Sequence, residues 1–236
     1  MKVRLKFRKY GVMKFIGHLD MMRYFQKAMR RANIPIAYSQ GFSPHMIMSF
    51  ANPLGVGLTS DGEYFDIELI KPIASDIAIK QLNEVMVEGV EITAFVEIPE
   101  AQKTGMSIVA AADYYIIPKE CEITEEFIAA FNRFVAEDHI VVMKKTKKSY
   151  REVDIRPLIY KMYLEDEKIF VQVATGSVEN LKPELVMDAL IDYAGEEKGI
   201  YKFNYHRVEV YAENELRQKD GQDYISLQQL GTEIRL

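Results

Sequence analysis

The segment KVRLKFR (residues 2–8) alternates strictly between basic and apolar side chains. This period of two places the apolar residues on one face and the cations on the other, which predicts a strand with one buried face. The segment from 63 to 70 alternates in the same way. There we expect Phe65, Ile67 and Leu69 to face the core, and Tyr64, Asp66 and Glu68 to face outward.

Between these strands, residues 18–33 carry apolar side chains at helical spacing, namely Leu19, Met22, Phe25 and Met29. Asp20 in the first turn and Arg30 with Arg31 in the last turn favour the helix dipole. Pro35 cannot continue the helix. The sequence therefore predicts an amphipathic helix that ends before Pro35.

The order of elements in the first hundred residues is strand, helix, strand, strand, helix, strand. The predicted ranges are 2–8, 18–33, 45–51, 63–70, 75–87 and 90–98, with a glycine-rich loop at 52–62 and Ser75 as the cap of the second helix. This order is typical of the ferredoxin-like (split βαβ) fold.

The same plan recurs in the second half without a repeat of residues. We expect a strand at 113–118, a helix capped by Thr124, a strand at 139–145, a hairpin of 153–165 and 168–175 around Asp166, a helix at 183–194 closed by Gly195, and a strand at 201–212. The prediction is an α+β chain of two tandem ferredoxin-like (βαββαβ) halves with antiparallel sheets. The expected domains are 1–100 and 106–212, followed by a polar, poorly packed tail at 213–236.

Composition excludes several classes of protein. Of the 236 residues 48% are hydrophobic, which favours a packed globule, and no apolar run is long enough to cross a membrane. Residues 1–10 lack the apolar core of a signal peptide, so a cytoplasmic protein without membrane contact is expected. The single cysteine, Cys121, cannot form an internal disulfide or hold zinc or an iron–sulfur cluster by itself. We expect no metal and no cofactor.

Charge is distributed unevenly along the chain. Residues 1–50 hold ten of the 30 lysines and arginines but one of the 35 acids, Asp20, although the whole chain has a net charge of -5. This asymmetry points to an anionic partner for the amino-terminal part.

The cations of the first strand, Arg4, Lys6 and Arg8, have two interpretations. On an open sheet face they would resemble RNA-binding modules of this topology, with Tyr64 and Phe95 as the aromatic side chains. Alternatively, acids on the neighbouring strands, such as Asp66, Glu68, Glu91 and Glu97, neutralise them. We favour the second interpretation.

The helix carries a continuous basic stripe without an opposing acid. Its members are Arg23, Lys27, Arg30 and Arg31. The stripe is either a solvated face or a surface that binds a phosphate backbone.

The loop YSQGFSPH (38–45) is the strongest candidate binding element. Its residues Tyr38, Ser39, Gln40, Gly41, Phe42, Ser43 and His45 offer backbone amides and hydroxyls for an anion and two rings for stacking. The alternative is an ordinary turn. A second basic segment, KKTKKSYR (144–151), is either solvated or a further phosphate contact.

His18, Asp20 and Glu63, together with Ser60, are weak candidates for acid–base chemistry. His45 follows the other end of the helix, roughly 20 Å from His18 at about 1.5 Å per residue. Helix capping is the simpler explanation for His18.

Two stretches carry a family resemblance. The segment GHLDMMRYFQKAMRRANIPIAYSQGFSPH with SFANPLGVGLTSDGEYFDIEL (within 17–69), and KSYREVDIRPLIYKMYLED (148–166), resemble the radical-SAM-linked protein family, whose members lie beside or are fused to a cobalamin-binding radical SAM protein. The resemblance implies that such a protein is the partner, and it favours RNA as a ligand. With one cysteine, this chain is not itself the radical enzyme.

Three functions remain open. The first is an accessory protein that binds tRNA, rRNA or another anionic ligand for a radical SAM partner. The second is an RNA-modifying enzyme with the tandem architecture of tRNA pseudouridine synthases, although the Gly-Arg-Thr-Asp run of that class is missing. The third is a protein–protein adaptor.

Overall fold

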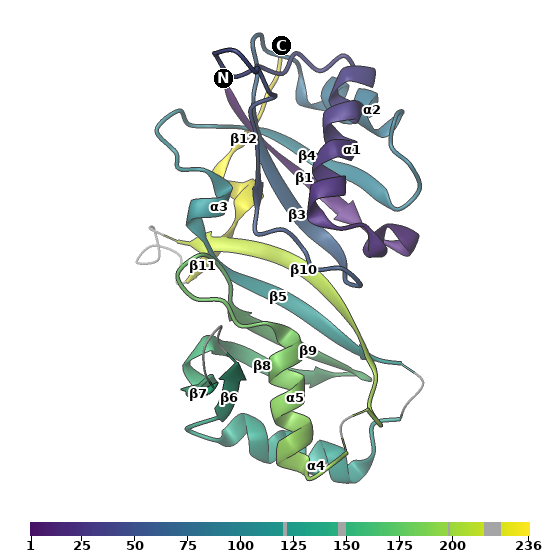
Figure 1. The fold of residues 1–236 in the computed structure, drawn as a ribbon, viewed down its shortest axis with the longest axis vertical. Coiled ribbons are helices and arrows are strands. Elements are labelled where there is room, and N and C mark those ends of the chain that lie inside the picture. The colour runs from purple at the N-terminus through teal and green to yellow at the C-terminus, as the bar shows by residue number, and fades with distance from the viewer. Residues whose placement is uncertain (120–121, 146–149, 198, 215–222) are drawn as a thin grey trace. The chain divides into compact units, whose positions relative to one another are not determined.

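The computed structural model describes residues 1–119, 122–145, 150–197, 199–214 and 223–236. Over these residues the chain is a mixed α+β protein with five α-helices, three short 3-10 helices and twelve strands. Neighbouring strands in both halves of the chain pair in antiparallel fashion. The chain forms two compact units, unit 1 (Met1–Ala111 with Arg207–Leu236) and unit 2 (Ala112–His206) (Figure 1).

Unit 1 contains every element predicted for the first hundred residues. These are β1 (Lys2–Lys9), α1 (His18–Arg31), β2 (Met48–Ala51), β3 (Thr59–Glu68), α2 (Ser75–Asn83) and β4 (Val90–Ile98), with the 3-10 helix η1 (Gly11–Phe15) after β1. β1 lies between β3 and β4, and β2 pairs with β3. The predicted loop at 52–62 is too long, because β3 already begins at Thr59.

One face of this sheet forms the core with the two helices. Phe7 of β1, Phe25 of α1 and Phe65 of β3 are almost fully buried there, with ring centroids 4.7–5.8 Å apart. Phe95 lies opposite Leu5 and belongs to the same core. The expectation that Phe95 is exposed is therefore wrong.

The opposite face of the sheet is also covered. Arg4 and Tyr64 are 0% and 1% exposed. The Arg4 guanidinium donates to the Leu227 carbonyl oxygen, so the segment after β10 lies on this face. Tyr64 was expected to face outward, into solvent. It does not reach solvent because a segment more than 150 residues away in the sequence packs over it.

The polar tail is ordered where the structure describes it. Its described elements are two short strands and a 3-10 helix. The strand β11 (Tyr224–Ser226) pairs with β10, the 3-10 helix η3 (Leu227–Leu230) follows it, and the strand β12 (Thr232–Glu233) pairs with β4. Leu227 and Ile234 are buried, and Ser226 with Gln229 forms a capping box. The expected poor packing is wrong for the described part of the tail, where Leu227 and Ile234 are buried.

Ser75 also differs from its predicted role. Ala74 is the N-cap of α2, and the Ser75 hydroxyl instead donates to the Phe95 carbonyl and accepts from the Ile234 amide. It therefore links β4 to the tail.

Unit 2 is built from the second set of predicted elements. They are β5 (Val109–Pro118), α4 (Glu125–Ala136), β6 (Val141–Lys145), β7 (Tyr150–Asp154), η2 (Arg156–Leu158), β8 (Ile159–Glu165), β9 (Lys168–Ala174), α5 (Pro183–Ala194) and β10 (Phe203–Glu213). The first residues of β5 and the last residues of β10 belong to unit 1. The short helix α3 (Gly105–Ile108) precedes β5. The strand order is β10-β5-β9-β8, and β6 with β7 forms a separate hairpin.

The helix-cap and turn residues predicted for unit 2 are confirmed. The Thr124 hydroxyl accepts from the Phe127 amide, and Gly195 ends α5 in the left-handed region. Asp166 makes the turn between β8 and β9 with a φ of 53°. The expected single strand at 153–165 is wrong, because Pro157 lacks an amide donor and a 3-10 turn separates β7 from β8.

No helix in the described parts of the chain combines the length and apolar character that a membrane crossing needs.

Candidate functional site

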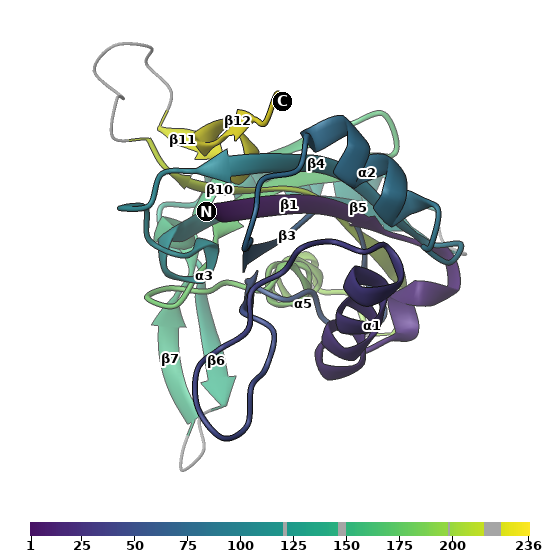
Figure 2. The same ribbon diagram turned by 90° about the horizontal axis from the view of Figure 1, so that it is seen from above.

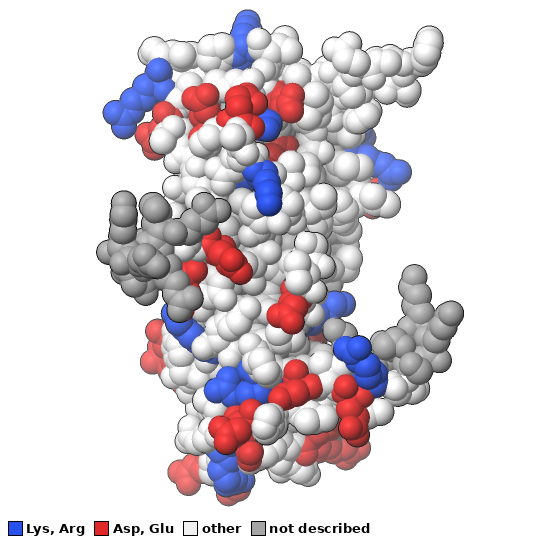
Figure 3. Space-filling view, turned by 90° about the vertical axis from the view of Figure 1, so that its left-hand side faces the viewer, with Lys and Arg blue, Asp and Glu red and all other residues white. Residues whose placement is uncertain are grey.

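The cations of β1 are neutralised inside unit 1. Arg4 forms a bidentate ion pair with Asp66 at 2.7 and 3.0 Å. Lys6 meets Glu209 at 2.6 Å, and Arg8 meets Asp61 at 2.7 Å. The interpretation that acids of neighbouring strands match these cations is confirmed for Arg4, which pairs with Asp66, and for Arg8, which also meets Glu91. It is wrong for Lys6, because Glu209 lies on β10, which is not adjacent to β1. In the upper part of Figure 3, which shows unit 1, both acidic and basic side chains lie on the face shown.

The Arg4–Asp66 pair is the most buried of these contacts. Asp66 also accepts from the Gly105 amide at 2.7 Å. A Cβ atom at Gly105 would lie 2.8 Å from the Ala51 Cβ, so the backbone approaches closely because position 105 has no side chain. These interactions hold α3 against β2 and β3.

The cations of α1 have a different environment. Arg23 pairs with Asp20 at 3.0 Å, and Arg31 donates to the Val85 carbonyl at 2.8 Å. The expectation of no acid opposite the stripe is thus wrong for Arg23. Lys27 and Arg30 are exposed and have no ion-pair partner among the described residues.

The loop from Tyr38 to His45, which follows α1 and precedes β2 in the sequence, projects from unit 1 (Figure 2). Its base is closed by a bridge from Tyr38 to Met46 and by hydrogen bonds between Ser39 and His45, including Ser39 Oγ to His45 Nδ1 at 2.9 Å. Gly41 has a φ of 110°. The Ser39 hydroxyl is therefore used within the loop and is not free to line an anion site.

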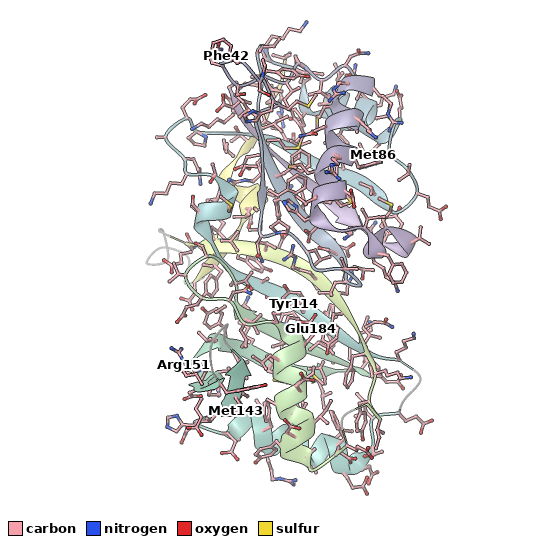
Figure 4. The ribbon with its side chains drawn as sticks, viewed as in Figure 1. Phe42, Met86, Tyr114, Met143, Arg151 and Glu184 are labelled. Atoms are coloured by element: carbon pink, nitrogen blue, oxygen red, sulfur yellow. The ribbon has the colours of Figure 1, made fainter. Side chains whose placement is uncertain are left out.

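The tip of this loop is unusually exposed. Phe42 is 111% exposed and lies at the outer edge of the unit (Figure 4), and Tyr38 is 45% exposed. Gln40 and Ser43 are exposed as well. The rings of Phe42 and Tyr38 are therefore accessible from solvent.

The weak acid–base candidates each have a separate environment. The His18 ring packs against Phe50 with centroids 5.1 Å apart, and burial lowers the pKa of His18. It does not cap α1, since Gly17 is the N-cap. Asp20 pairs with Arg23, as described above. The structure thus shows no contact of His18 with either carboxylate.

Glu63 belongs to a buried structural cluster. Its carboxylate accepts from Arg207, which also donates to the Asn52 carbonyl at 2.8 Å. The Ser60 hydroxyl accepts from the Gly62 amide. Lys9, also buried, donates to the Ile16 carbonyl, and desolvation lowers the pKa of Lys9. These contacts fix the loop after β2 in place.

A cavity of about 200 Å³ opens beside the base of the loop. It is the feature that sequence reasoning missed, although His45 lines it. Its polar lining includes Lys2 and Glu68, and its apolar lining includes Met48 and Ile98. Four separate segments contribute to it, so no local motif could have revealed it.

Two further expectations concern metal and the second basic segment. No group of three metal-binding side chains is present among the described residues. The segment KKTKKSYR lies largely outside the described residues, as does Cys121.

Comparison with known proteins places the chain in a family. Residues 2–183 match the family described as an uncharacterized protein conserved in bacteria (DUF2344), and the chain belongs to it. A search of curated proteins found no match. Among solved structures, the chain is similar to one described as "Crystal Structure of a Cbf5-Nop10-Gar1 Complex", with 10% identity and a TM-score of 0.45. That similarity covers 93% of this chain and spans 56% of the other.

Proposed function

We propose that this protein is an RNA-binding accessory protein of a radical SAM system, and that it holds RNA on α1 and the loop 38–45 of unit 1. The single observation that carries the proposal is the pair of exposed cations Lys27 and Arg30, which have no ion-pair partner within the described residues, on a helix that leads into this loop. The partnership with a radical SAM protein rests on the family resemblance of the sequence alone.

The chemistry of this surface fits a single-stranded nucleic acid. Exposed cations bind phosphates through counterion release, and exposed rings such as Phe42 and Tyr38 stack on unpaired bases. Tyr38 follows Arg31 by seven positions, which at about 3.3–3.6 Å per residue limits their separation to roughly 25 Å. One short single-stranded RNA can therefore contact both α1 and the loop 38–45.

The strand order supports a tandem ferredoxin-like architecture, which is part of the proposal. In unit 1 the order β4-β1-β3-β2 matches the split βαβ pattern. In unit 2 the order β10-β5-β9-β8 matches it again when the β6–β7 hairpin is treated as an insertion. The covered sheet face of unit 1 argues that RNA binds on the helix side.

The test is RNA binding across a salt series. We expect the full chain to bind a short single-stranded RNA at low salt and to lose affinity linearly with the logarithm of salt concentration. Fluorescence anisotropy measures both. Absence of binding at low salt, or binding that does not depend on salt, contradicts the proposal.

One observation favours an adaptor as a second candidate. Val12, Phe15, Leu19 and Val56 are 60–76% exposed. At this surface, a hydrogen bond from the Gly57 amide to the Lys14 carbonyl joins the loop after β2 to the 3-10 helix η1. A partner captured by the full chain after nuclease treatment, and lost in Phe15→Ser, supports the adaptor. The enzyme alternative has no such observation, since Asp20 is exposed and paired with Arg23.

A further inference from the structure

The cavity beside the loop 38–45 contains an unmatched carboxylate. Glu68 is half-buried, lines the cavity, and makes no side-chain hydrogen bond or ion pair within the described residues. Its neighbour Asp66 is fully engaged by Arg4 and the Gly105 amide. A carboxylate that is partly removed from water without a partner favours a ligand that donates hydrogen bonds.

Lys2 lines the same cavity as this carboxylate. Lys2 and Glu68 are directly opposite each other in the β1–β3 register, so their side chains lie on one face of the sheet about 4.5–5.5 Å apart at the Cα atoms. The Lys2 ammonium turns to Glu100, donating to its carbonyl oxygen at 2.6 Å. Because an ammonium has three donors, Lys2 can still donate to a ligand.

The size and walls of the cavity fit a planar ring. Its volume of about 200 Å³ compares with about 150 Å³ for a protein cavity that takes up benzene. Ile47 and Ile98 supply apolar lining, and Ile98 lies opposite Lys2 in the β1–β4 register. His45 belongs both to the loop and to the cavity lining, which connects the two.

We propose that this cavity binds one unpaired nucleobase, and that Glu68 and Lys2 select guanine. Guanine offers two adjacent N–H donors on its Watson–Crick edge, which match the two oxygens of a carboxylate, and a carbonyl oxygen beside them for Lys2. Uracil offers one N–H between two carbonyl oxygens and fits least well. This inference rests on the proposed function for the source of the base, because loop 38–45 would deliver it.

The experiment compares two probes with the full chain: a short oligouridylate, and the same oligomer with one guanosine. We expect the guanosine to increase affinity about tenfold or more, since a bidentate base contact gives discrimination of that order. Glu68→Gln should remove this preference and leave oligouridylate affinity unchanged. Thr104→Phe, at an exposed residue that lines the cavity, should also remove it, which guards against misfolding of the first variant.

Competition by guanosine monophosphate identifies the source of the base. If it displaces the guanosine oligomer, the cavity accepts the free nucleotide; if it does not, the cavity accepts the base within RNA. A preference that is absent, or that persists in both variants, overturns the inference while RNA binding stands. If no oligomer binds, the proposed function fails. In that case, binding of guanosine monophosphate to the wild type but not to Glu68→Gln still supports the cavity as a base-binding site. Absence of that binding overturns the inference as well.

Discussion

The cations of β1 and those of α1 both lie in the basic amino-terminal part of the chain, but their environments differ. Arg4 on β1 is fully buried and bound to Asp66, whereas Lys27 and Arg30 on α1 are exposed and lack an acidic partner within the described residues. Both segments contribute to the basic character of residues 1–50. The difference teaches that net charge along a sequence does not locate a binding surface, because cations on a buried sheet face are used for folding.

The comparison is tested most strongly at Arg4. Arg4→Met leaves the Asp66 carboxylate buried without its counterion, and we expect a loss of about 3–5 kcal/mol in the free energy of unfolding. Urea denaturation measures it.

The control for this change is the double variant Arg4→Met with Asp66→Asn. The amide can still accept from the Gly105 amide but carries no charge, so most of the lost stability should return. A single variant as stable as the wild type would show that the β1 cations are not structural.

The second test concerns the other side of the comparison. Replacing both Lys27 and Arg30 with alanine should weaken RNA binding about tenfold and reduce the salt slope by about 1.4, since each single-strand phosphate contact contributes about 0.7. The free energy of unfolding should change by less than about 0.5 kcal/mol.

Lys80→Ala is the matched control, because Lys80 is an exposed lysine on α2 of the same unit. It should leave both the affinity and the slope unchanged. Equal losses in the control and the double variant would mean that RNA binds to diffuse charge and not to α1.

Whether the sequence predicts the partner of a cation depends on how far apart the two residues lie in the sequence. The alternation in residues 2–8 identifies the strand, and Asp66 and Glu91 were predictable partners because both lie on adjacent strands of the same half. Glu209, which pairs with Lys6, lies 203 positions away, and Leu227, which accepts from Arg4, lies 223 positions away. No local pattern encodes such contacts.

The candidate site shows the same limit. The exposed stripe and the loop 38–45 follow from helical spacing and turn chemistry. The cavity does not, because Lys2, Glu68 and Ile98 meet there only when β1, β3 and β4 pair in their observed register. The capping role expected for His18 is wrong for a similar reason, since its ring packs against Phe50 of β2.

His18, at the start of α1, allows a pH test of burial on this helix. Because burial lowers its pKa below the ordinary value of 6.5, the folded protein binds a proton at His18 less readily than the unfolded chain. The stability contribution is complete above pH 6.5 and is lost as pH falls from there through the folded pKa. Urea denaturation at several pH values should show this decline, and His18→Gln should reduce it. A His18 resonance that titrates above 6.5 would contradict the assignment.

The smallest effect is expected at the ion pair of α1 itself. Arg23 and Asp20 are both about two thirds exposed, and they are spaced i,i+3 on the helix. Solvent screens such a pair, so Arg23→Ala should cost about 0.2–0.5 kcal/mol of unfolding free energy, an order of magnitude less than the change at Arg4. The effect should shrink further at high salt, whereas the buried pair of β1 should be nearly insensitive to salt. A large, salt-independent loss at Arg23 would remove the distinction between structural cations on the strand and available cations on the helix.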